Sequence, residues 1–113
     1  IAAAQGCDII VSTGLFPSTA AARTVADQRG LRYAHASYCP LYLPSHHHSP
    51  GPWPSRPFPP GMTDRRELWA HNAETMNILF GGALNDLRVS LGMPPLSNAR
   101  DHTRGDHPLL ASD

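Results

Sequence analysis

A proline-rich segment, Tyr38 to Gly61, restricts where regular secondary structure can form in this chain. It holds 8 of the 12 prolines, together with four aromatic residues and the run His46-His47-His48. Loops of this length inside a compact domain are usually either functional or disordered. The segment directly follows a predicted strand, Arg32 to Ser37. The position of that strand therefore helps to decide whether the segment is functional or disordered.

The residues before this segment predict a strand–helix–strand unit. Cys7 to Thr13 is a short apolar, β-branched run, typical of a strand buried on both faces. A helix is expected over Ala20 to Arg29, with Ser18 or Thr19 as its N-cap. Leu31 to Ser37 predicts a second strand, and a unit of this kind places its two strands parallel.

The carboxyl ends of the two predicted strands define a candidate binding edge. Gly14, Leu15 and Phe16 follow the first strand, and Tyr38 follows the second. Ligands of open α/β sheets bind at this edge. The proline-rich segment is therefore predicted to be a ligand-facing wall rather than a linker.

The longest helix signal covers residues 62–92. Asp64 and Glu67 resemble a capping box, and Gly81-Gly82 predicts a kink or a close approach to another backbone. The tail, residues 93–113, is predicted to be loop. Seven apolar residues recur at the helical period: Trp69, Ala73, Met76, Phe80, Leu84, Leu87 and Leu91.

Composition argues against several classes of function. The net charge is +0, so the chain shows no footprint for binding nucleic acid. No apolar run reaches the ~20 residues of a membrane span, and no secretion signal is visible, which together predict a cytoplasmic protein.

Three consecutive histidines in an extended segment alternate in direction, so no metal site is predicted. A zinc-binding domain is kept as a further alternative.

The chain resembles a known family over residues 6–113. The matching runs are GCDIIVSTGLFPSTAAARTVADQRGLRYAHASYCPLYLPS, then the proline-rich segment, then TDRRELWAHNAETMNILFGGALNDLRVSLGMPPL. They resemble the N-terminal half of actinobacterial natural-product glycosyltransferases, which act on vancomycin-type aglycones, and of related mycobacterial glycolipid enzymes. The most specific part is CPLYLPS combined with the later LGMPPL.

The resemblance implies a fold class and a function. It implies an α/β, partial Rossmann-like fragment of the acceptor-binding domain, residues 1–113, in an inverting glycosyltransferase of GT-B architecture. Its partners would be a small-molecule acceptor, either a hydroxylated aglycone or a lipid, and a C-terminal donor domain that binds the UDP- or TDP-sugar. The catalytic base would precede Ile1 and the donor site would follow Asp113. The chain itself is therefore expected to hold no catalytic residue, no metal and no cofactor.

An acceptor site is predicted where the proline-rich segment, the strand ends and the start of the long helix meet. Aromatic side chains there would stack on an apolar scaffold, while histidine and asparagine would orient its hydroxyl groups. The alternative is a non-enzymatic binding module that uses the proline and aromatic segment. The predicted acceptor-binding residues are Gly14, Leu15, Phe16, Tyr38, Tyr42, His46, Trp53, Phe58, Trp69 and Asn72.

Overall fold

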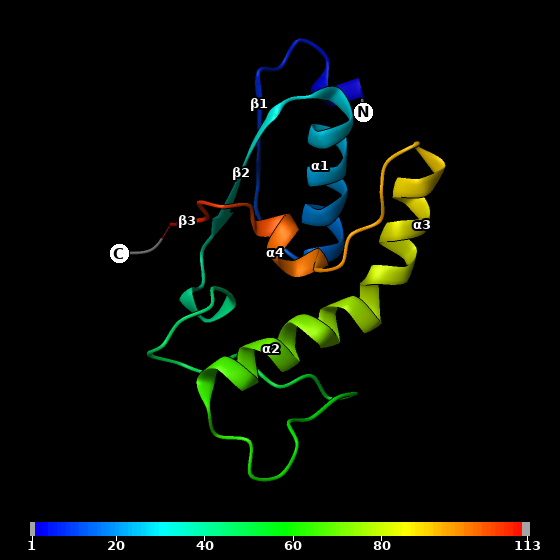
Figure 1. The fold of residues 1–113 in the computed structure, drawn as a ribbon. Coiled ribbons are helices and arrows are strands. Elements are labelled where there is room, and N and C mark those ends of the chain that lie inside the picture. Colours follow the sequence, from blue (N-terminus) through cyan, green and yellow to red (C-terminus); the bar gives the residue numbers. More distant parts are fainter. Residues whose placement is uncertain (1, 112–113) are drawn as a thin grey trace.

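A three-stranded parallel sheet with helices beside it makes up the described part of the chain, residues 2–111 of the computed structural model (Figure 1). The strands are β1 (Ile9–Ser12), β2 (Arg32–Ser37) and β3 (Leu109–Leu110), in the order β1-β2-β3. Both neighbouring pairs are parallel, which confirms the α/β class. Residue 1, which belongs to the predicted strand–helix–strand unit of residues 1–37, lies outside the described residues. So do residues 112–113, which belong to the predicted tail.

Helix α1 (Phe16–Arg29) connects β1 to β2 and confirms the strand–helix–strand unit. It begins earlier than predicted, with Leu15 as the N-cap, so the assignment of Ser18 or Thr19 as N-cap was wrong. The hydroxyl of Ser18 instead donates back to the carbonyl oxygen of Leu15 at 2.8 Å. Pro17 fits the first turn because the backbone N–H groups there have no acceptor within the helix, so the N–H that proline lacks is not missed.

The prediction that the first strand is buried on both faces was wrong. Ser12 is buried, but Ile9 is 44% exposed and Val11 is 61% exposed. Helix α1 lies against one face of β1 and β2 (Figure 1), and Ile9 and Val11 alternate onto the other. Among the described residues, nothing covers this second face of the strand to the extent that helix α1 covers the first.

The predicted helix over residues 62–92 is two helices joined by a wider turn. Helix α2 (Arg65–Met76) leads into a π-helical turn (Asn77–Gly81) and then into α3 (Gly82–Ser90). The two helices differ in direction (Figure 1), so the kink is confirmed at the predicted place. A close backbone approach is absent at this point, because a Cβ atom added to Gly82 would meet nothing within 4 Å. The change in direction leaves Leu87 42% exposed, although it belongs to the apolar stripe.

Asp64 caps the start of α2, which confirms one half of the predicted capping box. The Asp64 carboxylate accepts hydrogen bonds from the backbone N–H groups of Arg66 at 2.9 Å and Glu67 at 3.1 Å. We expect Asp64→Ala to lower the free energy of unfolding by about 1 kcal/mol, because these donors lose their protein acceptor. Urea unfolding followed by circular dichroism measures this. Asp64→Asn keeps the acceptor and should stay close to wild type, and equal losses in both variants would contradict the capping role.

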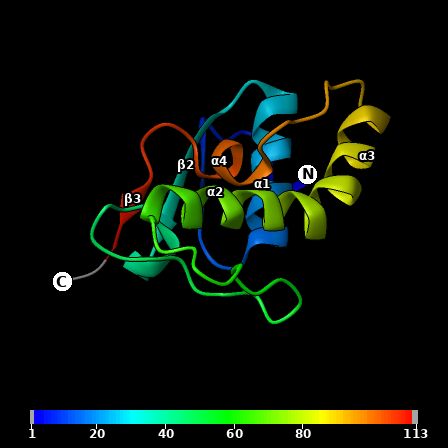
Figure 2. The same ribbon diagram turned by 60° about the horizontal axis from the view of Figure 1, so that its bottom comes forward.

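The tail is structured, so its assignment as loop was wrong. Helix α4 (Ala99–Arg104) begins at Asn98, whose side chain accepts a hydrogen bond from the N–H of Asp101. Farther along the tail, β3 extends the sheet beside β2. Figure 2 shows α4 enclosed by the other elements, and it packs against α1, α2 and β2. A small apolar cluster forms around it from Ala20, Leu84 and Ala99, with Phe16 and Leu96 at its border.

A partly buried ionic cluster ties α1, α3 and α4 together. The Asp27 carboxylate accepts hydrogen bonds from Arg23 at 2.9 Å and from Arg88 at 3.0 Å, and it lies 2.6 Å from the ring Nε2 of His102. The Arg88 side chain is only 5% exposed. Its charge therefore depends on Asp27 for compensation.

Apolar side chains remain on the surface of this fold. The solvent-accessible area is 7064 Å², against about 6,100 Å² expected for a folded monomer of this mass. Within residues 2–111, no helix is both long enough and apolar enough to cross a bilayer. The exposed apolar residues include Ile9, Val11, Ile78, Leu79, Leu87 and Val89.

Candidate functional site

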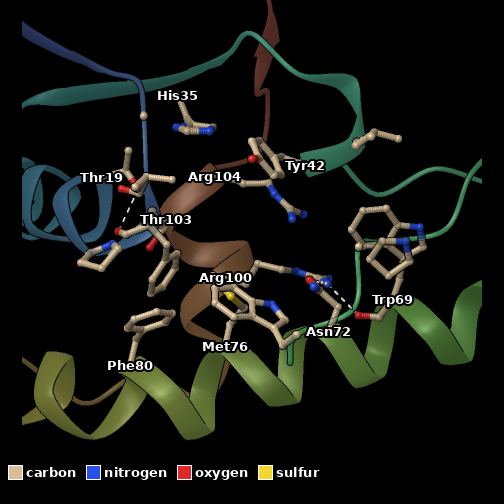
Figure 3. Close-up of a pocket in the computed structure, with 18 of the residues that line it drawn as sticks. Thr19, His35, Tyr42, Trp69, Asn72, Met76, Phe80, Arg100, Thr103 and Arg104 are labelled. Carbon is tan, nitrogen blue, oxygen red and sulfur yellow. Dashed lines mark hydrogen bonds between the residues drawn. The ribbon is translucent and has the colours of Figure 1, made fainter. Parts of the chain in front are cut away.

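A cavity of about 610 Å³ lies where the strand ends, the proline-rich segment, α2 and α4 meet (Figure 3). Its volume falls within the range usual for small-molecule sites, roughly 300–1,000 Å³. The lining residues are Gly14, Leu15, Phe16, Pro17, Thr19, His35, Leu41, Tyr42, Pro50, Gly51, Pro52, Trp53, Pro54, Trp69, Asn72, Met76, Phe80, Arg100, Thr103 and Arg104.

The sheet determines one side of this cavity. Ser12 pairs with His35 at the carboxyl ends of β1 and β2, so the loops that follow these strands leave the same edge. Gly14 turns the first loop with a φ of 103°, a left-handed conformation that favours glycine. The second loop forms a short 3₁₀ turn, Pro40–Tyr42, which brings Tyr42 to the cavity.

The proline-rich segment is fastened along α2. The indole Nε1 of Trp69 donates to the carbonyl oxygens of Ser45 and His48, both at 3.1 Å. Farther along the segment, the Arg56 guanidinium donates to Thr75 Oγ1 at 2.9 Å. Figure 2 shows the segment running beside α2. These contacts hold its prolines as a wall of the cavity.

Aromatic rings form the apolar part of the cavity. The Phe80 ring lies 5.2 Å from that of Phe16 and 5.9 Å from that of Trp53, measured between centroids. The three residues come from the π-helical turn, α1 and the proline-rich segment. Met76 lies one turn before Phe80 and also lines the cavity. Such a surface suits a flat apolar ligand.

Polar groups gather at the opposite part of the lining. Arg100 Nη1 donates to the carbonyl oxygen of Trp69 at 2.6 Å and to Asn72 Oδ1 at 3.0 Å. Its guanidinium carbon lies 5.6 Å from the Trp69 ring centroid, and that of Arg104 lies 5.9 Å from it. Two guanidinium groups therefore lie within cation–π distance of one indole ring.

The electrostatics of this region follow from burial. Desolvation, together with the neighbouring charge of Arg100, lowers the pKa of Arg104 to about 10, against a smaller opposing effect of Asp101. Burial and the charge of Arg104 also lower the pKa of His35. At neutral pH the cavity therefore presents a neutral imidazole beside a cationic guanidinium.

Comparison with known proteins decides the family. No protein-family model matches the chain. It is 38% identical over 112 residues to glycosyltransferase GtfE, 39% identical to glycosyltransferase GtfC and 35% identical to vancomycin aglycone glucosyltransferase, all from Amycolatopsis orientalis. Each alignment covers 99% of the chain and 27% of the relative. The chain corresponds to a segment of a vancomycin-type glycosyltransferase. It spans about a quarter of the length of these relatives.

Most residues predicted for the acceptor site of this glycosyltransferase segment come together in the cavity. Those that line it are Gly14, Leu15, Phe16, Tyr42, Trp53, Trp69 and Asn72. Tyr38 and His46 are exposed and lie outside the lining, as does Phe58, whose ring packs edge-on against His71 at 5.5 Å. Two parts of the proline-rich segment reach the cavity: Leu41 and Tyr42 near its start, and Pro50 to Pro54 in its middle.

Several lining residues of the glycosyltransferase segment were not predicted. Arg100, Thr103 and Arg104 belong to α4, whereas the sequence predicts loop for this part of the chain. Asn98 was an available signal for the start of this helix, because Asn is a preferred N-cap residue. Its side-chain oxygen accepts a hydrogen bond from the N–H of Asp101, three residues later. No comparable local pattern marks His35, which reaches the cavity through the pairing of β1 and β2.

The histidine run does not form a metal centre within the described residues. Among residues 2–111 no group of three or more His, Cys, Asp or Glu side chains is placed to hold an ion. His48 packs edge-on against Trp69, with a centroid distance of 5.8 Å, and so belongs to the fastening of the proline-rich segment.

Proposed function

We propose that the chain is part of the acceptor-binding, Rossmann-like domain of an inverting GT-B glycosyltransferase. The enzyme would transfer a sugar from a UDP- or TDP-sugar to a hydroxyl group of a natural-product or lipid acceptor. The observation that carries this proposal is the alignment of 99% of the chain with named glycosyltransferases. The cavity supports it independently, because it opens at the edge of the parallel sheet where α/β folds bind ligands.

The residues of the cavity suit an acceptor better than a nucleotide. Phe16, Trp53 and Phe80 supply aromatic faces for an apolar scaffold, while Asn72 and His35 supply a few polar groups that can orient a hydroxyl. The sequence contains no glycine-rich phosphate-binding motif. We therefore assign binding and orientation of the acceptor to this chain, and donor binding and the catalytic base to sequence outside it.

The test is a transfer assay on the natural polypeptide that contains these residues. Incubated with UDP-glucose or TDP-glucose and an aromatic aglycone, it should yield a product heavier by one hexose in mass spectrometry. The 113 residues alone should yield none. A folded natural polypeptide that binds aglycones without transferring sugar, across a panel of nucleotide sugars, would favour the binding-module alternative.

A cavity variant connects that activity to the site. Trp53→Ala removes an aromatic face and should raise the KM for the acceptor by about tenfold or more, because burying such a ring is worth roughly 1.5–3 kcal/mol. The KM for the nucleotide sugar should not change. Phe58→Ala is the matched control outside the lining. Equal effects of the two variants on the KM for the acceptor would contradict the proposed position of the site.

A further inference from the structure

Helix α4 places a cationic region at one end of the candidate acceptor cavity. Arg100 and Arg104 are one helical turn apart, and both line the cavity. Figure 3 shows the Arg104 guanidinium pointing into the cavity, toward the side of α2. The remaining walls are largely aromatic or aliphatic. A positive charge in such surroundings needs a partner.

The two arginines differ in how well they are compensated. Arg100 donates three hydrogen bonds, to the carbonyl oxygen of Trp69, to Asn72 and to the Asp101 carboxylate at 3.0 Å. Arg104 lies 3.7 Å from the same carboxylate, too far for a hydrogen bond. The Arg104 side chain is only 11% exposed, whereas that of Asp101 is 54% exposed and screened by solvent. Arg104 therefore has only a long ion pair with an exposed carboxylate that Arg100 shares, and its charge is weakly compensated by residues 2–111.

Two further polar atoms at this end lack partners. His35 and Thr103 are each more than nine-tenths buried and line the cavity. His35 Nδ1 and Thr103 Oγ1 have no hydrogen-bond partner among the described residues. Buried polar groups are normally satisfied, and those left unsatisfied are costly. Because both atoms are themselves closed off from solvent, the guanidinium of Arg104 is the group here that points into the cavity and can meet a polar ligand group.

We propose that this end binds one carboxylate group of the acceptor, which accepts paired hydrogen bonds from Arg104. The inference rests on the proposed function and names the acceptor class: an aromatic, hydroxylated molecule that carries an acid group. A planar guanidinium matches a carboxylate in a two-bond geometry. A single, weakly compensated positive charge suits a monoanion better than a phosphate dianion. The aromatic walls formed by Phe16, Trp53 and Phe80 then hold the ring system.

The experiment is isothermal titration of the natural polypeptide that contains the chain with three probes of one ring system. These are 2-naphthoate, 2-naphthalenemethanol and 2-naphthyl phosphate. We expect 2-naphthoate to bind at least about tenfold more tightly than the neutral alcohol, since a hydrogen bond to a charged group contributes roughly 1.5–3 kcal/mol. The phosphate should bind more weakly than the carboxylate.

Variants assign the preference to one side chain. Arg104→Gln should reduce the ratio of the two affinities to near one, and Arg104→Lys should retain part of the ratio. Arg29→Gln, at an exposed arginine outside the lining, should leave the ratio unchanged. If wild type binds 2-naphthoate and the alcohol with equal affinity, the proposal is overturned. It is also overturned if Arg104→Gln keeps the preference for 2-naphthoate.

The outcomes separate this inference from the proposed function. Sugar transfer without a preference for the carboxylate would overturn the carboxylate site alone. A preference that depends on Arg104, in a polypeptide that transfers no sugar, would overturn the proposed function alone. Tighter binding of the phosphate probe would exclude a monoanion site.

Discussion

Replacing Trp69 by alanine should lower the free energy of unfolding by about 3–5 kcal/mol, the usual cost of truncating a buried aromatic residue. The ring is 6% exposed and lies between α2 and the proline-rich segment. Its removal also frees the carbonyl oxygens of Ser45 and His48 from their common donor. Urea unfolding measured by circular dichroism gives the free energy.

A second variant separates the two roles of this residue. Trp69→Phe retains an aromatic ring but loses the indole donor, so we expect a smaller loss of stability, about 1–3 kcal/mol. It should also increase the rate at which a protease cuts within residues 45–60. If Trp69→Phe is as stable as wild type and equally resistant to protease, the indole N–H does not fasten the segment.

Replacing Asp27 by alanine should lower the free energy of unfolding by about 3 kcal/mol. The Arg88 side chain, 5% exposed, would lose its only carboxylate partner and keep only the carbonyl oxygen of Pro94, at 3.0 Å, within the described residues. Leaving one member of a buried ion pair without its partner typically costs this much. Asp86→Ala, at an exposed aspartate on α3, should change stability by no more than about 0.5 kcal/mol. Similar losses in the two variants would contradict the special role of Asp27.

The same carboxylate makes stability depend on pH. Burial by itself would raise the pKa of Asp27, but hydrogen bonds from His102 and Arg88 and the charge of Arg23 outweigh it, so the pKa is lowered from 3.8. A carboxyl group with a lower pKa in the folded state stabilises the fold above its unfolded pKa. This contribution is lost as the pH falls below about 4 and through the folded pKa. Urea unfolding between pH 7 and pH 2 should therefore show the difference between wild type and Asp27→Asn shrinking below pH 4. A constant difference would exclude this linkage.

The local part of the fold could be predicted from the sequence because its signals are short-range. Asp64 marks a helix start, Gly81-Gly82 marks a kink, and the parallel strands follow from their spacing along the chain. The tail could not be predicted in this way. Leu109 and Leu110 form a strand because β2 offers a free edge, and no periodic pattern in two residues reveals that pairing.

The residues of the candidate site likewise divide into those that the sequence could predict and those that it could not. Trp53, Tyr42 and Phe16 could be placed because they follow strand ends or lie in a segment of unusual composition. Arg104 and His35 could not, since each reaches the cavity through contacts between elements far apart in sequence. Met76, a member of the apolar stripe, is buried and also lines the cavity. Periodicity identifies a buried face but not what faces it.

The positions of the two tryptophans make the intrinsic fluorescence of these 113 residues a probe of the cavity. The 113 residues contain two tryptophans, Trp53 and Trp69, and both border the cavity. All indole emission from these residues therefore originates at the candidate site. A ligand that enters should quench or shift that emission without any label. The spectrum of the 113 residues would thus follow occupancy of the cavity and loosening of the proline-rich segment in one measurement.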